Sequence, residues 1–145
     1  MRRVNTTTTY GVGIGWRPEI AGFVAGLPGL RFAEVVAESV HAHDDLPAGL
    51  PELLDRGVTV IPHGVRLSLG GAEPVDPGRV EHFAAVAARL GAPLVSEHIA
   101  FVRAGGVEAG HLLPLPRSRE AVDAMVANVN RVQASLDVPI ALEPI

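Results

Sequence analysis

Short apolar runs of strand length alternate along the chain with segments whose apolar residues recur at helical spacing. The runs predict strands at residues 10–16, 32–38, 58–62, 94–98 and 138–142. The helical spacing predicts helices at residues 18–26, 44–56, 79–90 and 118–136. Near-continuous apolar strands separated by helices are typical of a parallel sheet covered by helices. The pattern therefore predicts an α/β fold.

Turn and cap residues support several of these boundaries. Asp44 and Asp45 are suited to cap the second helix, and Gly57 is suited to end it. Residues 99–117 form a long connection between the fourth strand and the last helix. Because Gly105–Gly106 lies within this connection, we expect a hairpin-like excursion there, placed where it could cover a substrate.

Polar residues of metal-binding type stand where successive predicted strands end. Glu38 ends the second strand, and His63, His98 and Glu143 mark the ends of the third, fourth and fifth. An open doubly wound sheet concentrates its site at one switch point, whereas a (β/α)8 barrel carries site residues at the carboxyl ends of several strands. The recurrence of candidates along an arc favours the barrel.

The length of the chain limits how much of a barrel it can form. A (β/α)8 barrel typically takes about 250 residues. We therefore expect the 145 residues to form the N-terminal five-strand portion of a TIM barrel, as a single incomplete domain over residues 1–145 with no second domain. Such a sheet has two open edges, through which self-association is expected unless another segment pairs with them.

The residue types at the strand ends predict a metal site. Neutral imidazole and carboxylate suit Fe(II), Mn or Zn, and two histidines with one carboxylate leave positions open for oxygen or a substrate. The chain contains no Cys, so any metal must be bound through nitrogen and oxygen. His63, His98 and Glu143 are therefore the predicted metal ligands.

Three further polar residues lie close to these ligands in the sequence. Glu97 and His98 are neighbours on a strand and must point to opposite faces, and we expect His98 to face the barrel. Glu97 then either supports a ligand or is a structural carboxylate. Glu38 fits a role at the pocket edge or an ion pair with an Arg. Arg66, in the loop after the third strand, could hold a substrate carboxylate or lie in solvent.

Composition excludes several function classes. All twelve basic residues are Arg, which removes Schiff-base lysine chemistry, and the absence of Cys removes disulfides and a cysteine nucleophile. The net charge of -4 without a basic cluster argues against nucleic acid or a membrane surface as partner. Residues 5–9 are polar where a signal peptide would be apolar. We therefore expect a cytoplasmic protein.

Six short motifs in a fixed order resemble one known family. They are Gly13-Ile14-Gly15 with Arg17, Glu34 with Glu38, His63-Gly64-Val65 before Leu67-Ser68-Leu69-Gly70-Gly71, Ser96-Glu97-His98, Leu112-Leu113-Pro114-Leu115-Pro116, and Asn128 with Gln133 before Glu143. With these motifs the sequence resembles the DUF692 (UPF0276) family of multinuclear non-heme iron-dependent oxidative enzymes.

The resemblance implies a TIM barrel with two or three irons in its mouth. Family members use oxygen to modify residues, often cysteines, of ribosomally made precursor peptides, usually with a partner protein that presents the peptide. By resemblance, His63, His98 and Glu143 match metal ligands of the family, whose remaining ligands come from later strands. Two positions depart from the family pattern, namely Pro144 in place of Asn and His111 in place of an acidic residue.

Three functions are compatible with this sequence. The first is an iron-dependent oxidative enzyme that acts on a peptide. The second is a divalent-metal isomerase or hydrolase of the xylose-isomerase-like type, in which Zn or Mn activates water or polarises a carbonyl. The third is a non-catalytic truncated barrel fragment. Oxygen consumption with Fe(II) distinguishes the first from the second.

Overall fold

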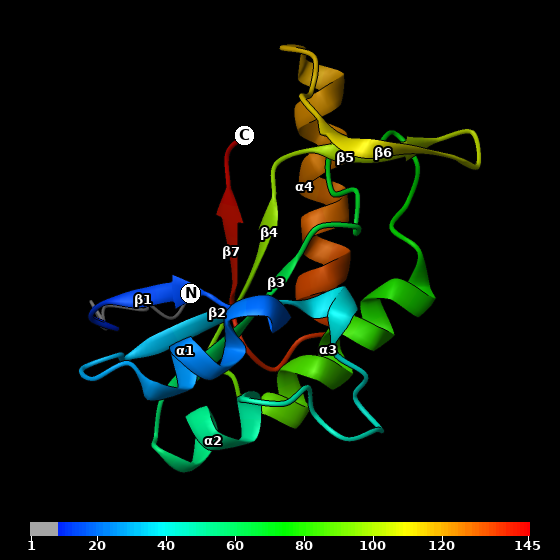
Figure 1. Cartoon of the computed structure of the whole chain (residues 1–145). Helices are drawn as coiled ribbons and strands as arrows, with labels where there is room; N and C mark the ends of the chain where they lie inside the picture. The colour runs from blue at the N-terminus through cyan, green and yellow to red at the C-terminus, as the bar shows by residue number, and fades with distance from the viewer. Residues whose placement is uncertain (1–8) are drawn as a thin grey trace.

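A five-stranded parallel sheet forms the centre of the computed structural model, which describes residues 9–145 (Figure 1). Its strand order is β1-β2-β3-β4-β7. The strands are β1 (Gly13–Gly15), β2 (Phe32–Val36), β3 (Thr59–Gly64), β4 (Val95–His98) and β7 (Ile140–Glu143). The sheet confirms the predicted α/β class. Most of the polar N-terminal stretch, on which the expectation of no signal peptide rests, lies outside the described residues.

Helices connect the strands of this sheet. They are α1 (Ala21–Gly26), α2 (Leu50–Asp55), α3 (Pro77–Leu90) and α4 (Arg119–Ala134), with 3₁₀ turns η1 (Pro18–Ile20) and η2 (Ala37–Ser39). The side chains of Asp76 and Ser118 cap α3 and α4 by accepting hydrogen bonds from the amides of Arg79 and Ala121. The four predicted helices are confirmed, although α1 and α2 are short.

Pairing register assigns the strand side chains to two faces. It joins His63 to Ser96 and His98 to Glu143, and paired neighbours in a parallel sheet point to the same side. These four residues therefore share one face, which we call the inner face. The opposite face packs on the helices, where Val60 and Val95 are at most 1% exposed and belong to the main hydrophobic core.

The long connection after β4 contains an antiparallel hairpin. It consists of β5 (Phe101–Ala104) and β6 (Val107–Leu113), with Gly105 and Gly106 both at positive φ in the turn. The predicted excursion is therefore confirmed. Figure 1 shows the hairpin at the end of the molecule toward which β4 and β7 point.

Two local predictions were wrong. Glu38 does not end a strand, because β2 stops at Val36 and Glu38 lies in the 3₁₀ turn η2. Asp44 and Asp45 do not cap α2, which begins at Leu50 after Gly49 at φ 93°. Pro47 and Pro51 explain the later start, since proline disfavours helix in the residue before it but is tolerated in a first helical turn.

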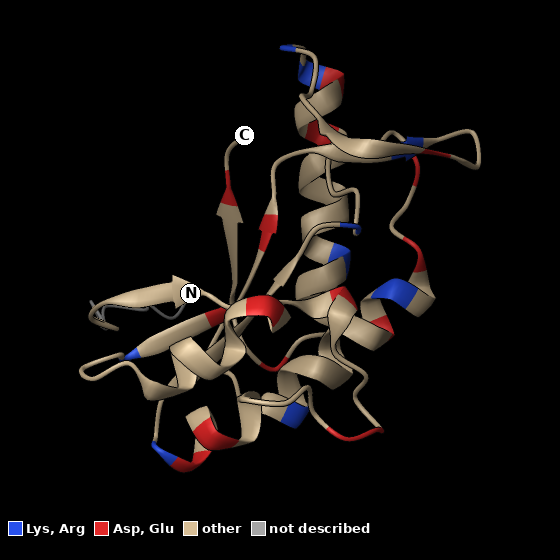
Figure 2. Cartoon of the chain, viewed as in Figure 1, with Lys and Arg blue, Asp and Glu red and all other residues tan. Residues whose placement is uncertain are grey.

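The outer strands of the sheet, β1 and β7, each pair on one side only within residues 9–145. None of the helices in this range is long and apolar enough to cross a membrane. Arginines occur on several elements, and this view shows no single basic patch (Figure 2). This distribution agrees with the absence of a basic cluster in the sequence.

Candidate metal centre

Three potential metal ligands meet on the inner face at the carboxyl ends of neighbouring strands. His63 lies near the end of β3, His98 ends β4, and Glu143 ends β7. Each offers one ligand atom, and these three atoms lie within 4.8 Å of one another. The structure therefore brings together the three residues that the sequence predicts as ligands.

The distances within this group suit a shared cation. His63 Nε2 lies 2.9 Å from His98 Nε2, and Glu143 Oε2 lies 3.7 Å from His63 Nε2 and 4.0 Å from His98 Nδ1. At a usual metal–nitrogen length of about 2.1 Å, two ligands at a right angle lie about 3 Å apart. The Nε2 atoms of the two imidazoles thus have the spacing of adjacent ligands, and the carboxylate oxygen lies somewhat farther from each ring.

Ser96 contacts the ring nitrogen of His63 that lies opposite the candidate ligand atom Nε2. Its hydroxyl oxygen lies 2.8 Å from His63 Nδ1, and both residues are buried. When the Ser96 hydroxyl oxygen accepts a hydrogen bond from His63 Nδ1–H, Nε2 carries the free lone pair that a metal requires. In the sequence, Ser96 stands out only as part of the motif Ser96-Glu97-His98. Because Ser96 precedes His98 by two residues on a strand, its side chain points to the same face as that predicted ligand.

One buried ring nitrogen of His98 lacks a hydrogen-bond partner among residues 9–145. Its Nδ1 atom makes no hydrogen bond to the part of the chain that the structure describes, although the atom is inaccessible to solvent. Burial of an unsatisfied polar group is costly. A cation or a bound polar group beside the ring would supply the interaction that His98 Nδ1 lacks.

Exposure differs across the group. The side chains of His63 and His98 are 8% and 13% exposed, whereas that of Glu143 is 53% exposed. The imidazoles are therefore held by packing, and the carboxylate marks the side from which solvent reaches the group. A cation held here would keep positions open on that side.

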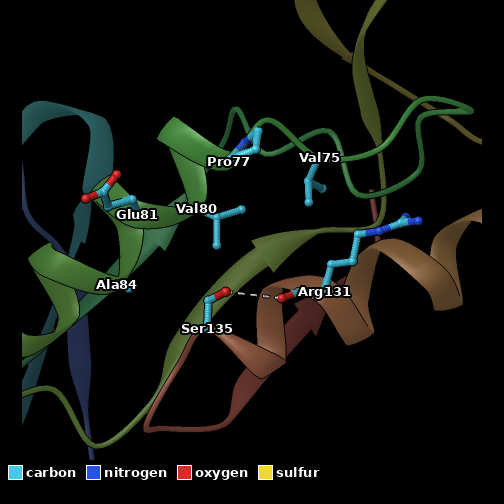
Figure 3. Close-up of a pocket in the computed structure, with 7 residues that line it drawn as sticks. All are labelled: Val75, Pro77, Val80, Glu81, Ala84, Arg131 and Ser135. Carbon is cyan, nitrogen blue, oxygen red and sulfur yellow. Dashed lines mark hydrogen bonds between the residues drawn. The ribbon is translucent and has the colours of Figure 1, made fainter.

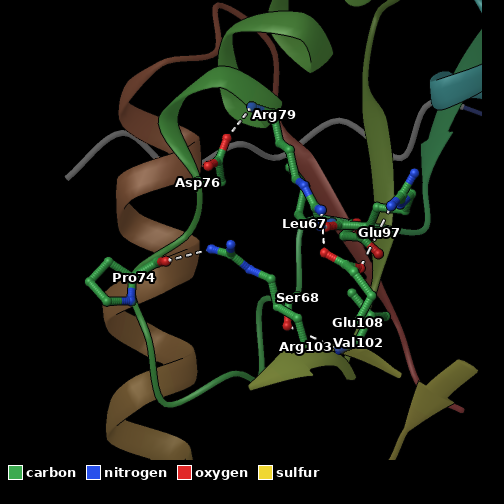
Figure 4. A network of polar contacts seen from close by, with 10 residues as sticks. Leu67, Ser68, Pro74, Asp76, Arg79, Glu97, Val102, Arg103 and Glu108 are labelled. Atoms are coloured by element: carbon green, nitrogen blue, oxygen red, sulfur yellow. Dashed lines mark hydrogen bonds and ion pairs between the residues drawn. The ribbon is translucent and has the colours of Figure 1, made fainter. Parts of the chain in front are cut away.

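Glu97 lies on the helix-facing side, away from the ligands, as its alternation with His98 predicts. It is 2% exposed, and its carboxylate accepts hydrogen bonds from the amides of Leu67 at 2.9 Å and His98 at 2.7 Å (Figure 4). Burial raises the pKa of Glu97 to about 7, the charge of Glu38 adds to this, and the two amides oppose it. Glu97 thus ties the loop after β3 to β4.

Glu38 and Arg66 lie beside the same loop. Glu38 Oε1 accepts a hydrogen bond from the Val65 amide at 3.0 Å, and its Oε2 atom is buried without a partner among residues 9–145. The structure shows no ion pair of Glu38 with an Arg in that range. Arg66 is half-exposed, and its guanidinium lies 3.7 Å from Glu108 of β6.

Cavities occur elsewhere on the molecule. One of about 450 Å³ lies between α3 and α4 (Figure 3). Its lining consists of Val75, Pro77, Val80, Glu81, Ala84, Arg131 and Ser135, so it includes none of the three potential ligands. A second, of about 300 Å³, lies between the loop after β3 and the hairpin.

Known proteins resemble this chain over all or nearly all of its length. A UPF0276 protein of Streptomyces avermitilis is 54% identical over an alignment of 152 positions that covers 100% of this chain and 31% of that protein. A UPF0276 protein of an Anaeromyxobacter species is 30% identical over 139 residues, or 95% of this chain and 49% of that protein. The chain thus spans about a third to a half of the length of these curated relatives.

A solved structure supports the barrel interpretation. The crystal structure of a D-psicose 3-epimerase in the presence of D-fructose matches with a TM-score of 0.52 at 14% identity, covering 90% of this chain and 50% of that one. At this identity the likeness shows the fold alone. With the five parallel strands, it identifies the fold as the N-terminal portion of a TIM barrel.

The family model for the RiPP precursor modification enzyme MbnB/TglH/ChrH matches residues 11–145. This match covers nearly the whole chain and agrees with the UPF0276 relatives. The chain therefore belongs to the MbnB/TglH/ChrH family, as its resemblance to DUF692 (UPF0276) predicted.

Proposed function

We propose that this chain supplies His63, His98 and Glu143 to a multinuclear iron centre that uses oxygen to modify residues of a ribosomally made precursor peptide. The observation that carries the proposal is the meeting of these three ligand atoms within 4.8 Å on the inner face. The family description, which concerns modification of a precursor peptide, supports the substrate class.

The donor set is one that iron uses. Two imidazoles and one carboxylate form the set that non-heme Fe(II) oxygenases use, with positions left open for oxygen or substrate. When bound, iron would supply the oxygen chemistry that amino-acid side chains lack. The chain's own residues would hold it, with Ser96 orienting His63 and packing restraining both rings.

We propose the remaining parts of such an enzyme by analogy with the family. Curated relatives extend beyond the matched region, so later strands of a complete barrel would contribute further ligands for two or three irons. A partner protein that presents the peptide is likewise proposed. Residues 1–145 would then form one incomplete barrel domain, whose open edges β1 and β7 meet the rest of a barrel or another copy.

Oxygen uptake tests the proposal. Protein loaded anaerobically with Fe(II) is mixed with oxygenated buffer and a cysteine-containing peptide, and oxygen is followed with an electrode against an equal amount of free Fe(II). We expect uptake above the blank in the native chain and in His43→Ala, an exposed His outside the group. We expect uptake at the blank level in His63→Ala.

Other outcomes identify the alternatives. The donor set also suits Zn and Mn, so turnover with these metals and no oxygen uptake would favour the isomerase or hydrolase. Iron bound without uptake or turnover would favour the non-catalytic fragment. Equal uptake by native protein and His63→Ala would contradict the proposed site.

A further inference from the structure

Hairpin β5–β6 leaves one strand edge free among residues 9–145. Among residues 9–145, β6 pairs only with β5, and residues 107–113 make no backbone hydrogen bond to any other described segment. Val107–His111 of this strand are exposed. A free strand edge can bind an extended peptide through its unpaired N–H and C=O groups. In β6 a register shift against β5 and Gly110 at φ 72° bend the strand between Glu108 and Leu113, so the regular part of the edge is Val107–Glu108.

The hairpin stands over the loop that follows His63. Between them lies the cavity of about 300 Å³, which we call the hairpin pocket. Its lining residues are Val65, Arg66, Val102, Glu108, Gly110, His111 and Leu112. Apolar side chains thus form its walls, and Arg66, Glu108 and His111 provide its polar groups. The pocket begins two residues beyond the predicted ligand His63.

The charged residues around the pocket differ in how many hydrogen bonds and ion pairs they form within the described part of the chain. Arg79 binds Glu108 closely and also donates to the Arg66 carbonyl at 2.7 Å, while Arg103 donates to the Pro74 carbonyl at 3.2 Å (Figure 4). The Arg79 contact is the main cause of the lowered pKa of Glu108. Glu108 therefore has its charge compensated by Arg79.

Nearby acids are also engaged. Glu73 accepts a hydrogen bond from the Gly105 amide, and Asp76 caps α3 through the Arg79 amide. Arg66, by contrast, reaches Glu108 only at 3.7 Å, and its side chain is 54% exposed. A guanidinium has five N–H donors in a planar fork that fits a carboxylate. Arg66 is thus the cation best placed to receive an incoming carboxylate.

We propose that an extended segment of the peptide substrate pairs with the free edge of β6 and places an acidic side chain on Arg66 in the hairpin pocket. This inference rests on the proposed function for its substrate class and adds where the peptide lies and which side chain is recognised. Binding at this place uses none of the three metal ligands.

Peptide binding without metal tests the inference separately from the iron chemistry. The probes are two fluorescein-labelled synthetic peptides of Thr and Ser, one with a central Glu and one with Gln at the same position. Anisotropy titrations are run in the presence of a chelator. We expect the Glu peptide to bind about threefold to tenfold more tightly than the Gln peptide, with the preference lost at high salt.

Matched variants assign the preference. Arg66→Gln is expected to abolish it, and Arg89→Gln, which alters an exposed Arg at the end of α3, is expected to retain it. Methylation of alternate peptide nitrogens should weaken both peptides if β6 pairs with the backbone. Equal binding of both peptides, no binding of either, or a preference that survives Arg66→Gln would overturn the inference, whatever the metal content.

Discussion

At the scale of single residues, the hydroxyl of Ser96 is the group that orients a predicted ligand. It lies 2.8 Å from His63 Nδ1 in a buried setting. We predict that Ser96→Ala weakens Fe(II) affinity by about tenfold or more, because groups that orient a ligating His typically contribute that much. Anaerobic metal titration measures this. Ser135→Ala, which removes an exposed hydroxyl at the residue after α4, should leave affinity unchanged.

The pKa of Glu97 predicts a pH dependence of stability. In the folded chain Glu97 keeps its proton up to about pH 7, whereas its ordinary pKa is 4.5. The folded state therefore binds more protons between these values, and the free energy of unfolding should fall as pH rises through this range, by up to about 3 kcal/mol.

Urea unfolding of metal-free protein at several pH values measures this decline. Glu97→Gln cannot titrate and should flatten the profile, while Glu81→Gln, an exposed change on α3, should keep it. An unchanged slope in Glu97→Gln would assign the dependence to other groups.

The sequence predicted the grouping of His63, His98 and Glu143 better than their surroundings. These three residues were predicted as ligands because each stands where an apolar strand ends, and the structure brings them together. Glu38 was placed wrongly at a strand end, since the turn into η2 depends on backbone geometry that hydrophobic pattern does not encode. The position of Arg66 3.7 Å from Glu108 depends on how the hairpin folds back, which no local signal predicts.

At the scale of elements, α4 holds the glycine-rich loop through one buried amide. Asn128 Nδ2 lies 3.1 Å from each of the carbonyl oxygens of Leu69, Gly71 and Glu73, among which its two N–H donors are shared. Its Oδ1 accepts a hydrogen bond from the Val75 amide at 3.3 Å. The side chain thus connects the last helix to the segment that leads into α3.

We predict that Asn128→Ala lowers the free energy of unfolding by about 3 kcal/mol, because buried backbone groups lose their partners. Urea unfolding of both chains provides the comparison. Asn130→Ala changes an exposed Asn of the same helix and should cost far less. A similar loss in both variants would mean that helix propensity, and not the loop contacts, explains the effect.

Element types were predictable where periodicity was strong. Apolar residues at helical spacing predicted α3 and α4 to within about two residues at each end. The pair Gly105–Gly106 predicted the hairpin turn. The start of α3 was placed two residues late, although Asp76 followed by Pro77 is a cap and first-turn signal. The helix predicted over residues 44–56 was longer than the observed α2, because Asp44 and Asp45 suit a turn as well as a helix cap.

At the scale of the whole molecule, the sheet ends in two strands that pair on one side only within residues 9–145. Large apolar side chains lie near the β7 edge, where Leu142 is 40% exposed, and on α4, where Val122 is 59% exposed. We predict that isolated copies associate through these surfaces, because strand edges and exposed apolar groups favour it. Sedimentation velocity over a concentration series measures this, and a monomer at every concentration would contradict it.

The most direct test of the account is the metal content of the chain purified anaerobically with Fe(II), with the oligomeric state determined in the same sample. The account predicts stoichiometric iron in the native chain and in His43→Ala, and its loss in His63→Ala and His98→Ala. Folded protein without iron, or iron retained in both ligand variants, would contradict the claim that the three strand-end residues form the metal site.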